Sequence, residues 1–256
     1  MGLLDGKIVL IGGGSSSMGE ATAELFAKEG AKGIGIHYSS SHEKVEKIIN
    51  NIKKDTEAIP LQADISKYIE VKGIIDKMIK KWKKIDIIIN YAGAPASLET
   101  WNKKLPDISD KEFLDPFVTD FLGSVHFYQA SVAHMKNNGG GKIIFTSSSP
   151  TINGDEEGFS FTVAKDAIRL MVKSFAPIAL KEYGVYLHII APGTTDTESN
   201  RKNYTKKQWD DMVKQIPLKR AVKSEEIAKV ASFLSSELSN GIVGQTIIVD
   251  GGEIRI

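Results

Sequence analysis

Residues 7–19 read KIVLIGGGSSSMG, an apolar run followed directly by a loop of glycine and serine. The run has the length of a buried strand, and residues 20–28 have the spacing of a helix. Glycines at such a turn let backbone amides approach a pyrophosphate, and the start of the helix favours its negative charge. The stretch predicts a dinucleotide-binding unit. Taken alone, a glycine-rich turn also fits a plain tight connection between a strand and a helix.

The rest of the chain repeats this alternation of strand and helix. Short apolar runs lie at residues 7–11, 33–37, 85–90, 142–146, 185–191 and 245–249, and helical spacing is seen at 20–28, 44–53, 71–78 and from Ser224 to about Ser235. The pattern predicts one α/β domain over residues 1–256, a doubly wound parallel sheet of Rossmann type with about seven strands and helices on both faces. Ligands bind at the carboxyl ends of strands in such sheets, so the loops near 94–110 and 193–215 are expected to border a substrate pocket.

Composition excludes several classes of function. The 33 basic and 32 acidic side chains nearly cancel, so no global field gathers nucleic acid or an anionic membrane. The chain has no cysteine, which excludes disulfides and thiolate metal sites, and we expect no metal. The start MGLLDGK lacks the pattern of a signal peptide, and no apolar run approaches the roughly 18 residues of a membrane span. A cytoplasmic location is the default expectation.

Five motifs then occur in a fixed order along the chain. They are Gly13-x-x-x-Ser17-x-Gly19, the pair Asp64 and Ile65, the turn Asn90-Tyr91-Ala92-Gly93, the segment Pro192-Gly193 with Thr195 and Thr197, and the ending GQTIIVDGG at 244–252. In this order they resemble the short-chain dehydrogenase/reductase family over nearly the whole chain, with Ser17 in place of the middle glycine of the loop.

The resemblance implies a nicotinamide dinucleotide as cofactor and a set of residues that bind it. These are Gly13, Ser16, Ser17, Met18, Gly19, Tyr38, Ser39, Asp64, Ile65, Asn90, Ala92, Gly93, Lys165, Pro192, Gly193 and Thr195. Members that bind NAD would carry an acid at the position of His37 to hold the ribose diol. No acid is present there, and the hydroxyls that follow suit a phosphate, although no arginine fork is available. We therefore expect NADP, with NAD as the alternative.

The resemblance also implies two catalytic residues that this chain keeps. Ser148 ends the segment GKIIFTSS and precedes position 161 by thirteen residues, as the family's catalytic serine does. Lys165 lies in the segment AKDAIRLM, which resembles the helix that carries the family's catalytic lysine. In the family the serine orients the substrate oxygen, and the lysine binds the nicotinamide ribose and lowers the pKa of a catalytic tyrosine.

Two other catalytic positions depart from the family. Phe161 stands at the tyrosine position, four residues before Lys165, and a phenyl ring can neither donate nor accept a proton. Asp120 stands at the position of the family's asparagine, and its charge can pair with Lys165. No other phenol replaces the tyrosine clearly. Tyr68 and Lys72 belong to the adenine end of the sheet, and the direction of the Tyr91 side chain is left open by the sequence.

Two functions follow as alternatives. The first is an oxidoreductase that transfers hydride between nicotinamide and a small-molecule carbonyl or secondary alcohol, with water, Asp120 or Lys165 delivering the proton. The second is a catalytically impaired or inactive dinucleotide-binding scaffold. The resemblance further implies a homotetramer, which the apolar ending EIRI would suit as a contact.

Overall fold

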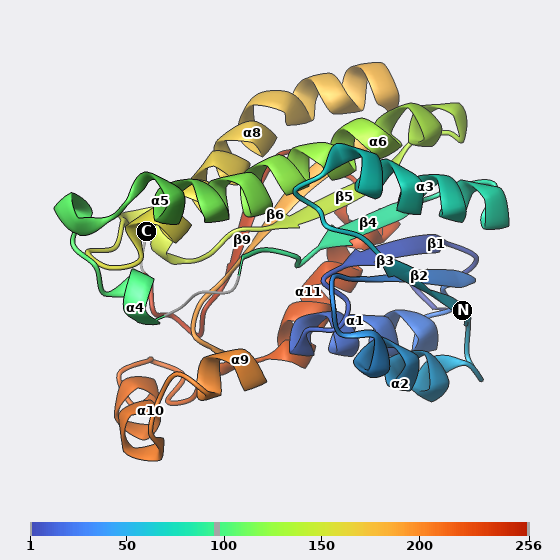
Figure 1. The fold of residues 1–256 in the computed structure, drawn as a ribbon. Coiled ribbons are helices and arrows are strands. Elements are labelled where there is room, and N and C mark those ends of the chain that lie inside the picture. Colours follow the sequence, from blue (N-terminus) through green and yellow to red (C-terminus); the bar gives the residue numbers. More distant parts are fainter. Residues whose placement is uncertain (1, 95–97, 255–256) are drawn as a thin grey trace.

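The structure is a computed structural model that describes residues 2–94 and 98–254. Residues 95–97 of the predicted pocket loop and residues 255–256 of the ending EIRI lie outside the described residues. Figure 1 shows a central sheet between two layers of helices. The described residues form a seven-stranded parallel sheet, so the doubly wound architecture predicted from the sequence is confirmed.

The sheet has the strand order β3-β2-β1-β4-β5-β6-β9. Its strands are β1 (Ile8–Gly12), β2 (Gly33–Tyr38), β3 (Glu57–Gln62), β4 (Ile87–Asn90), β5 (Gly141–Thr146), β6 (Val185–Pro192) and β9 (Thr246–Val249). The order reverses direction between β1 and β4, and the chain after these two strands carries the glycine-serine loop and the Asn90-Tyr91-Ala92-Gly93 turn. This reversal is the switch point at which such sheets bind ligands.

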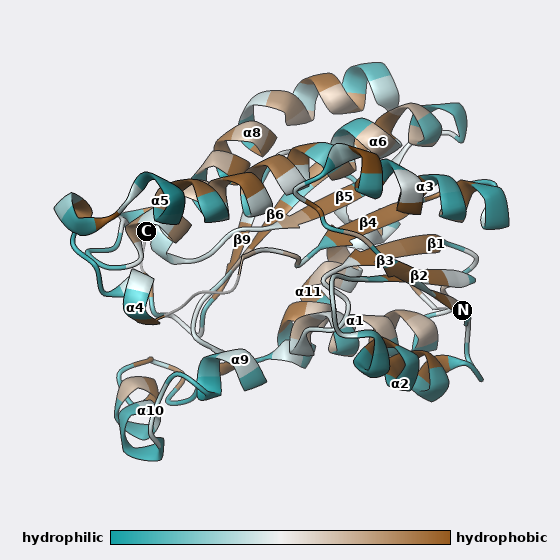
Figure 2. Ribbon diagram, in the orientation of Figure 1, coloured by the Kyte–Doolittle hydropathy of each residue, from teal (hydrophilic) through white to brown (hydrophobic). Residues whose placement is uncertain are grey.

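Helices cover both faces of the sheet (Figure 1). One layer holds α1 (Ser17–Lys28), α2 (His42–Ile52) and α11 (Ser224–Ser235), and the other holds α3 (Tyr68–Trp82), α6 (Gly123–Asn137) and α8 (Phe159–Tyr183). Figure 2 shows that the strands consist mostly of hydrophobic residues. Their buried side chains pack with those of the two helix layers in two hydrophobic cores, one on each face of the sheet. The helix predicted from Ser224 to about Ser235 has these bounds in the structure.

The strand β3 has no counterpart among the apolar runs found in the sequence. Its segment, Glu57–Gln62, contains Pro60, and most of its side chains are exposed or half-buried. An edge strand pairs on one side only, so it tolerates proline and lacks a continuous apolar run. This explains why periodicity alone did not reveal it.

Shorter elements surround the carboxyl ends of the strands. They are α4 (Leu98–Trp101), η1 (Leu105–Asp107), α5 (Asp110–Pro116), the π-helical η2 (Phe117–Leu122), α7 (Pro150–Asn153), the paired strands β7 (Thr195–Asp196) and β8 (Val222–Lys223), α9 (Glu198–Arg201), α10 (Lys206–Val213) and η3 (Glu237–Ser239). Figure 1 shows α9 and α10 extending away from the sheet below its carboxyl edge.

Candidate active site

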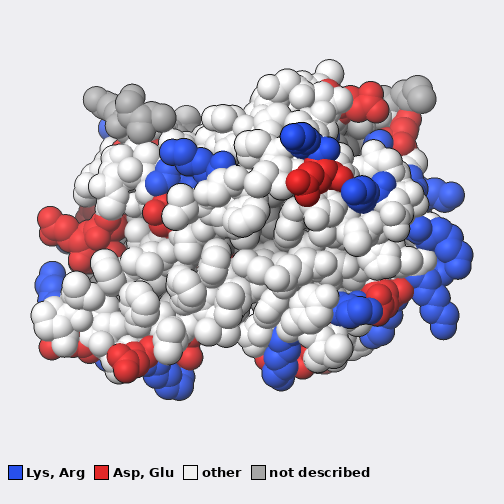
Figure 3. Space-filling view, turned by 90° about the horizontal axis from the view of Figure 1, so that it is seen from above, with Lys and Arg blue, Asp and Glu red and all other residues white. Residues whose placement is uncertain are grey.

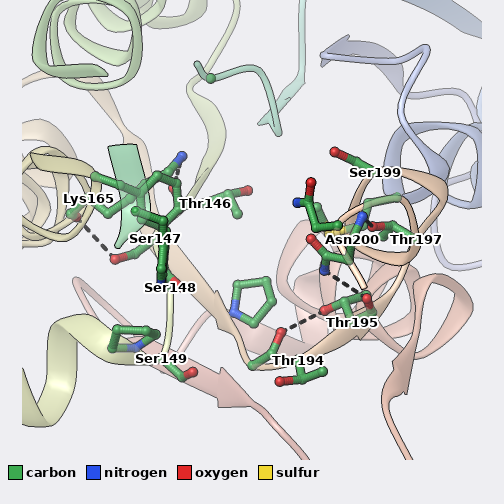
Figure 4. A pocket seen from close by; sticks show the side chains of 18 of the residues that line it. Thr146, Ser147, Ser148, Ser149, Lys165, Thr194, Thr195, Thr197, Ser199 and Asn200 are labelled. Carbon is green, nitrogen blue, oxygen red and sulfur yellow. Dashed lines mark hydrogen bonds between the residues drawn. The ribbon is translucent and has the colours of Figure 1, made fainter. Parts of the chain in front are cut away.

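A cavity of about 1050 Å³ lies at the carboxyl ends of the strands. Its walls come from the segments that follow β1, β4, β5 and β6, together with parts of both predicted pocket loops and the chain near Glu253. Figure 4 shows two groups of polar side chains that flank this space, one around Ser148 and Lys165 and the other around Thr195 and Asn200. The cavity is therefore polar at both ends and large enough for an extended ligand.

Close packing of backbone against backbone shapes the glycine-serine loop. Gly13 has a φ of +67°, and a Cβ atom there would lie 2.7 Å from the nitrogen of Ala92. A Cβ atom on Gly19 would lie 2.5 Å from the carbonyl oxygen of Gly13. Only glycine fits these two positions. Ser16 caps α1 by accepting a hydrogen bond from the nitrogen of Gly19 at 3.1 Å, and Ser17 and Met18 line the cavity beside it.

His37 supports this loop from the interior. Its Nδ1 accepts a hydrogen bond from the nitrogen of Gly13 at 3.1 Å, and its Nε2 lies 3.0 Å from the carbonyl oxygen of Ala63. The accepting Nδ1 requires the neutral ring, with the proton on Nε2 directed to Ala63. Burial lowers the pKa of His37, which favours the same neutral form. His37 is thus a buried support of the loop.

The residues after β2 differ in what they offer a ligand. The Tyr38 ring is buried, and its hydroxyl lies 2.7 Å from Nδ1 of His42. Ser39 and Ser40 are exposed at the end of the strand. The structure therefore places the serine hydroxyls, and not the Tyr38 hydroxyl, on the outer surface at this point.

The adenine-side pair is held by its own local contacts. The carboxylate of Asp64 accepts hydrogen bonds from the nitrogen and hydroxyl of Ser66, and these bonds lower the pKa of Asp64. Ile65 is buried and packs against Gly123, where a Cβ atom would lie 2.8 Å from its Cδ1. Neither residue lines the described cavity, so this pair is not brought together with the residues around Lys165.

The turn after β4 is held rigidly. Asn90 is buried, and its Oδ1 accepts a hydrogen bond from the nitrogen of Ala92 at 3.0 Å while its amide donates to Ser124 at 3.2 Å. Tyr91 directs its hydroxyl to Thr22 in α1 at 2.9 Å, and burial raises the pKa of Tyr91. The only phenol that the sequence left open as a substitute for the missing tyrosine is therefore engaged elsewhere.

Ser148 and Lys165 both line the cavity, on the side that β5 and α8 form. The Nζ of Lys165 lies 3.3 Å from the carbonyl oxygen of Thr146 and 5.6 Å from the centre of the Phe161 ring. The Phe161 ring also lines the cavity and meets the ring of Trp101 at a centroid distance of 5.5 Å. An apolar aromatic wall thus stands at the position for which the sequence resemblance predicted a tyrosine.

Asp120 lies behind this wall, in the π-helical segment η2. Its Oδ2 is 3.2 Å from Nζ of Lys165, and its Oδ1 accepts a hydrogen bond from the nitrogen of Ala94. The Asp120 side chain is fully buried and does not line the described cavity, whereas Lys165 does. Short π-helical segments often occur at functional sites, because they redirect a side chain. Here the segment carries the carboxylate that pairs with Lys165.

The segment after β6 forms the opposite wall. The hydroxyl of Thr195 donates to the carbonyl oxygen of Gly193 at 2.9 Å, and the amide of Asn200 donates to the carbonyl oxygen of Thr195 at 2.8 Å (Figure 4). Pro192 and Gly193 line the cavity here, and Glu253 accepts a hydrogen bond from the nitrogen of Thr194 at 2.8 Å.

Several residues of the cavity were not found from the sequence. They are chiefly Lys44, Glu198, Asn200 and Glu253. Polar residues at surface-helix and loop positions carry no periodic or motif signal, so nothing in the sequence distinguished them from solvated side chains. Within the described residues, no group of three or more His, Asp or Glu side chains is arranged to hold a metal, and no helix is long and apolar enough to span a membrane.

Comparison with known proteins places residues 13–253 within a family model described as enoyl-(acyl carrier protein) reductase. The chain is 32% identical over 262 residues to a short-chain dehydrogenase/reductase from Pestalotiopsis microspora, with 97% of this chain and 96% of the relative covered. It is 29% identical to glucose 1-dehydrogenase 2 from Bacillus subtilis, with 97% and 95% covered.

A 3-oxoacyl-[acyl-carrier-protein] reductase from Thermotoga maritima is 28% identical, with 97% of this chain and 98% of the relative covered. Among solved structures, 7α-hydroxysteroid dehydrogenase in complex with NADH and 7-oxo glycochenodeoxycholic acid matches with a TM-score of 0.90 and 26% identity. That match covers 99% of this chain and 96% of the other.

Proposed function

The chain belongs to the short-chain dehydrogenase/reductase family, and we propose that it is an NADP-dependent oxidoreductase acting on a carbonyl or a secondary alcohol. The observation that carries this proposal is the shared cavity, which brings Ser148 and Lys165 together with the glycine-serine loop. The loop suits a dinucleotide, because its tight glycine turn brings Ser15, Ser16, Ser17 and Met18 to the cavity at the start of α1. The bound nicotinamide would supply or accept the hydride.

The proposed binding residues form groups, each of which contacts a different part of the dinucleotide. In the loop, Ser16, Ser17 and Met18 line the cavity and are proposed to bind the pyrophosphate, whereas Gly13 and Gly19, whose amides donate to His37 and Ser16, shape the loop around it. The turn residues Asn90, Ala92 and Gly93 flank the nicotinamide half, together with Pro192, Gly193 and Thr195, and Asp64 and Ile65 flank the adenine. The side chain of Asn90 fixes the shape of its turn by accepting a hydrogen bond from the nitrogen of Ala92.

Ser148 is proposed to donate a hydrogen bond to the substrate oxygen, since its side chain lies on the cavity beside Lys165. The ring of Phe161 forms part of the cavity wall and takes no part in proton transfer. Of the three proton sources, water, Asp120 and Lys165, we favour Lys165, because it lines the cavity whereas Asp120 does not. In this proposal Lys165 delivers the proton to the substrate oxygen and is recharged by water, with Asp120 holding the positive charge in place.

The preference for NADP is supported by the residues after β2. No carboxylate stands there to repel a 2′-phosphate, His37 is turned inward, and Ser39 and Ser40 are exposed. Isothermal titration with NADPH and NADH measures this preference directly. A tenfold tighter binding of NADH would overturn it.

The competing proposal is a dinucleotide-binding scaffold without turnover. It is favoured by the combination of Phe161 with a Lys165 ammonium neutralised by Asp120. Oxidation of NADPH against a panel of ketones and aldehydes separates the two proposals. Turnover that disappears in Ser148→Ala supports the enzyme, whereas tight NADPH binding without any turnover supports the scaffold.

We further propose a cytoplasmic homotetramer. Figure 3 shows that the face over α6 and α8 has few charged side chains in its middle, and Leu170, Phe175 and Ile178 of α8 are exposed there by 63%, 51% and 46%. An apolar patch of this kind marks an interface in a soluble protein. Light scattering should give a mass near four times the 28.0 kDa of one chain.

A further inference from the structure

An ion pair in the cavity wall joins two parts of the chain that are far apart in sequence. The Nζ of Lys44, in the first turn of α2, lies 2.6 Å from Oε2 of Glu198 at the start of α9. Both side chains line the cavity, as do Ser15, Ser16 and Ser17 of the glycine-serine loop. The Lys44 ammonium therefore borders the same space as the loop proposed to bind phosphate.

Glu198 is shared by two lysines. Its Oε1 lies 2.7 Å from Nζ of Lys202, while its Oε2 pairs with Lys44. Hydrogen bonds to Lys202 and Lys44 lower the pKa of Glu198 to about 2, so this carboxylate is charged at any physiological pH. When Lys44 turns to another anion, Glu198 keeps Lys202 as its partner. The exchange therefore leaves no charge without a counter-ion.

Lys44 is an exposed cation of the cavity wall, on the helix that follows β2. Three lysines line the described cavity, and of these Lys165 is buried against Asp120 and Lys202 pairs with Glu198 from its own helical turn. The Lys44 side chain is 57% exposed. Water and salt screen an exposed ion pair, so its loss costs little stability. A phosphate carries more oxygens and, as a monoester, more charge than the carboxylate it would replace.

We propose that Lys44 binds a phosphate group of the dinucleotide, and that Glu198 competes with this phosphate for the Lys44 ammonium. The inference rests on the proposed function, and it adds a cation to the proposed dinucleotide site. The phosphate is either the 2′-phosphate of NADP or the pyrophosphate. Glu198 then limits affinity, because every bound phosphate must displace it from Lys44.

The test is calorimetric titration of NADPH, NADH and 2′,5′-ADP into wild type, Lys44→Gln, Glu198→Gln and the double variant at low salt. Lys47→Gln is the matched control, since Lys47 is exposed one turn further along α2 and does not line the described cavity. Lys44→Gln should weaken NADPH about tenfold, the loss expected for one charge-assisted hydrogen bond. Glu198→Gln should raise the affinity for NADPH about threefold. The control should change it less than twofold.

The double variant decides whether Glu198 acts by competition. It should bind NADPH like Lys44→Gln alone, because removing a competitor has no effect once its target is gone. If Lys44→Gln loses affinity only for NADPH and 2′,5′-ADP, Lys44 binds the 2′-phosphate. If it loses affinity equally for NADPH and NADH, Lys44 binds the pyrophosphate. The inference is overturned if Lys44→Gln behaves like the control, or if Glu198→Gln still tightens binding in the Lys44→Gln background. Wild type that binds neither dinucleotide would instead overturn the proposed function together with this inference.

Discussion

The ammonium of Lys165 lies 3.2 Å from the carboxylate of Asp120, and both side chains are buried. This ion pair changes the electrostatics of the site. A lysine whose charge is neutralised by a carboxylate exerts a weaker field on its surroundings. The pair therefore limits how strongly Lys165 would lower the pKa of a phenol at position 161.

Phe161→Tyr should raise the rate of carbonyl reduction at least about tenfold. The new hydroxyl would line the cavity near Ser148 and Lys165, and general acid catalysis typically contributes about 10² to 10⁴ in rate. The measurement is NADPH oxidation with a carbonyl panel. Phe159→Tyr is the control, because it adds a phenol to the same helix outside the described cavity. A fast wild type that Phe161→Tyr slows would show that this position serves another proton route.

Asp120→Asn combined with Phe161→Tyr should exceed either single variant in rate. Removing the carboxylate restores the full charge of Lys165, and that charge lowers the pKa of a phenol beside it. The amide oxygen can still accept the hydrogen bond from the nitrogen of Ala94. The measurement is kcat for all four proteins, read as a double-mutant cycle. Strict additivity of the two changes would argue against coupling through Lys165.

Asp120→Asn alone should lower stability by about 3 kcal/mol, because it leaves the buried ammonium of Lys165 without its counter-ion. Chemical denaturation measures this loss. Asp115→Asn, which removes an exposed carboxylate paired with Lys111 on α5, is the control and should cost less than about 1 kcal/mol. Equal losses for both variants would mean that the buried pair contributes no more stability than an exposed one.

Gly13→Ala should weaken dinucleotide binding at least about tenfold and lower the melting temperature. Its φ of +67° is unfavourable for alanine, and the new Cβ atom would press on the backbone of Ala92. Gly73→Ala is the control, since a Cβ atom there meets nothing within 4 Å and alanine favours the helix α3. The control should bind cofactor normally. Normal binding by Gly13→Ala as well would remove the loop from the proposed site.

Stability should fall as the pH drops from about 6.5 toward 4, because of His188. Burial lowers the pKa of His188 to about 4 from 6.5, and neither ring nitrogen has a hydrogen-bond partner within the described structure. Below pH 6.5 the unfolded chain therefore binds a proton that the folded protein excludes, a loss of about 2 kcal/mol at pH 5. Burial shifts the pKa of His37 in the same direction. Carboxylates with a lowered pKa, such as Glu198, reduce stability only below about pH 4.5, where the unfolded chain begins to bind their protons.

His188→Leu separates this effect from the others. The substitution removes the group that takes up a proton on unfolding. The variant should therefore lose less stability than wild type when the pH is lowered from 7.5 to 5. Melting temperature across this range is the measurement, with His134→Leu on α6 as the control, because His134 is only half-buried. Parallel pH profiles for wild type and His188→Leu would contradict the assignment.

The sequence predicted the central strands, because a parallel sheet covered on both faces requires continuous apolar runs such as Ile87–Asn90. It did not reveal β3, whose single paired side removes that requirement. The sequence did not show how the side chains of β2 divide between the two faces of the sheet. Successive side chains of a strand point to opposite faces, and the register of β2 turns Tyr38 toward α2 and His37 toward Gly13. Periodicity does not fix which face holds the ligand.

By itself the sequence determined the residue types at the reactive positions, including a phenyl ring at 161 and a carboxylate at 120. It also determined where glycine permits close backbone approach, since that property belongs to a single residue. Only the tertiary structure decided the partners of the charges, Lys165 with Asp120 and Lys44 with Glu198. Those pairs join segments that are distant along the chain, and their separation depends on how all the intervening strands and helices pack.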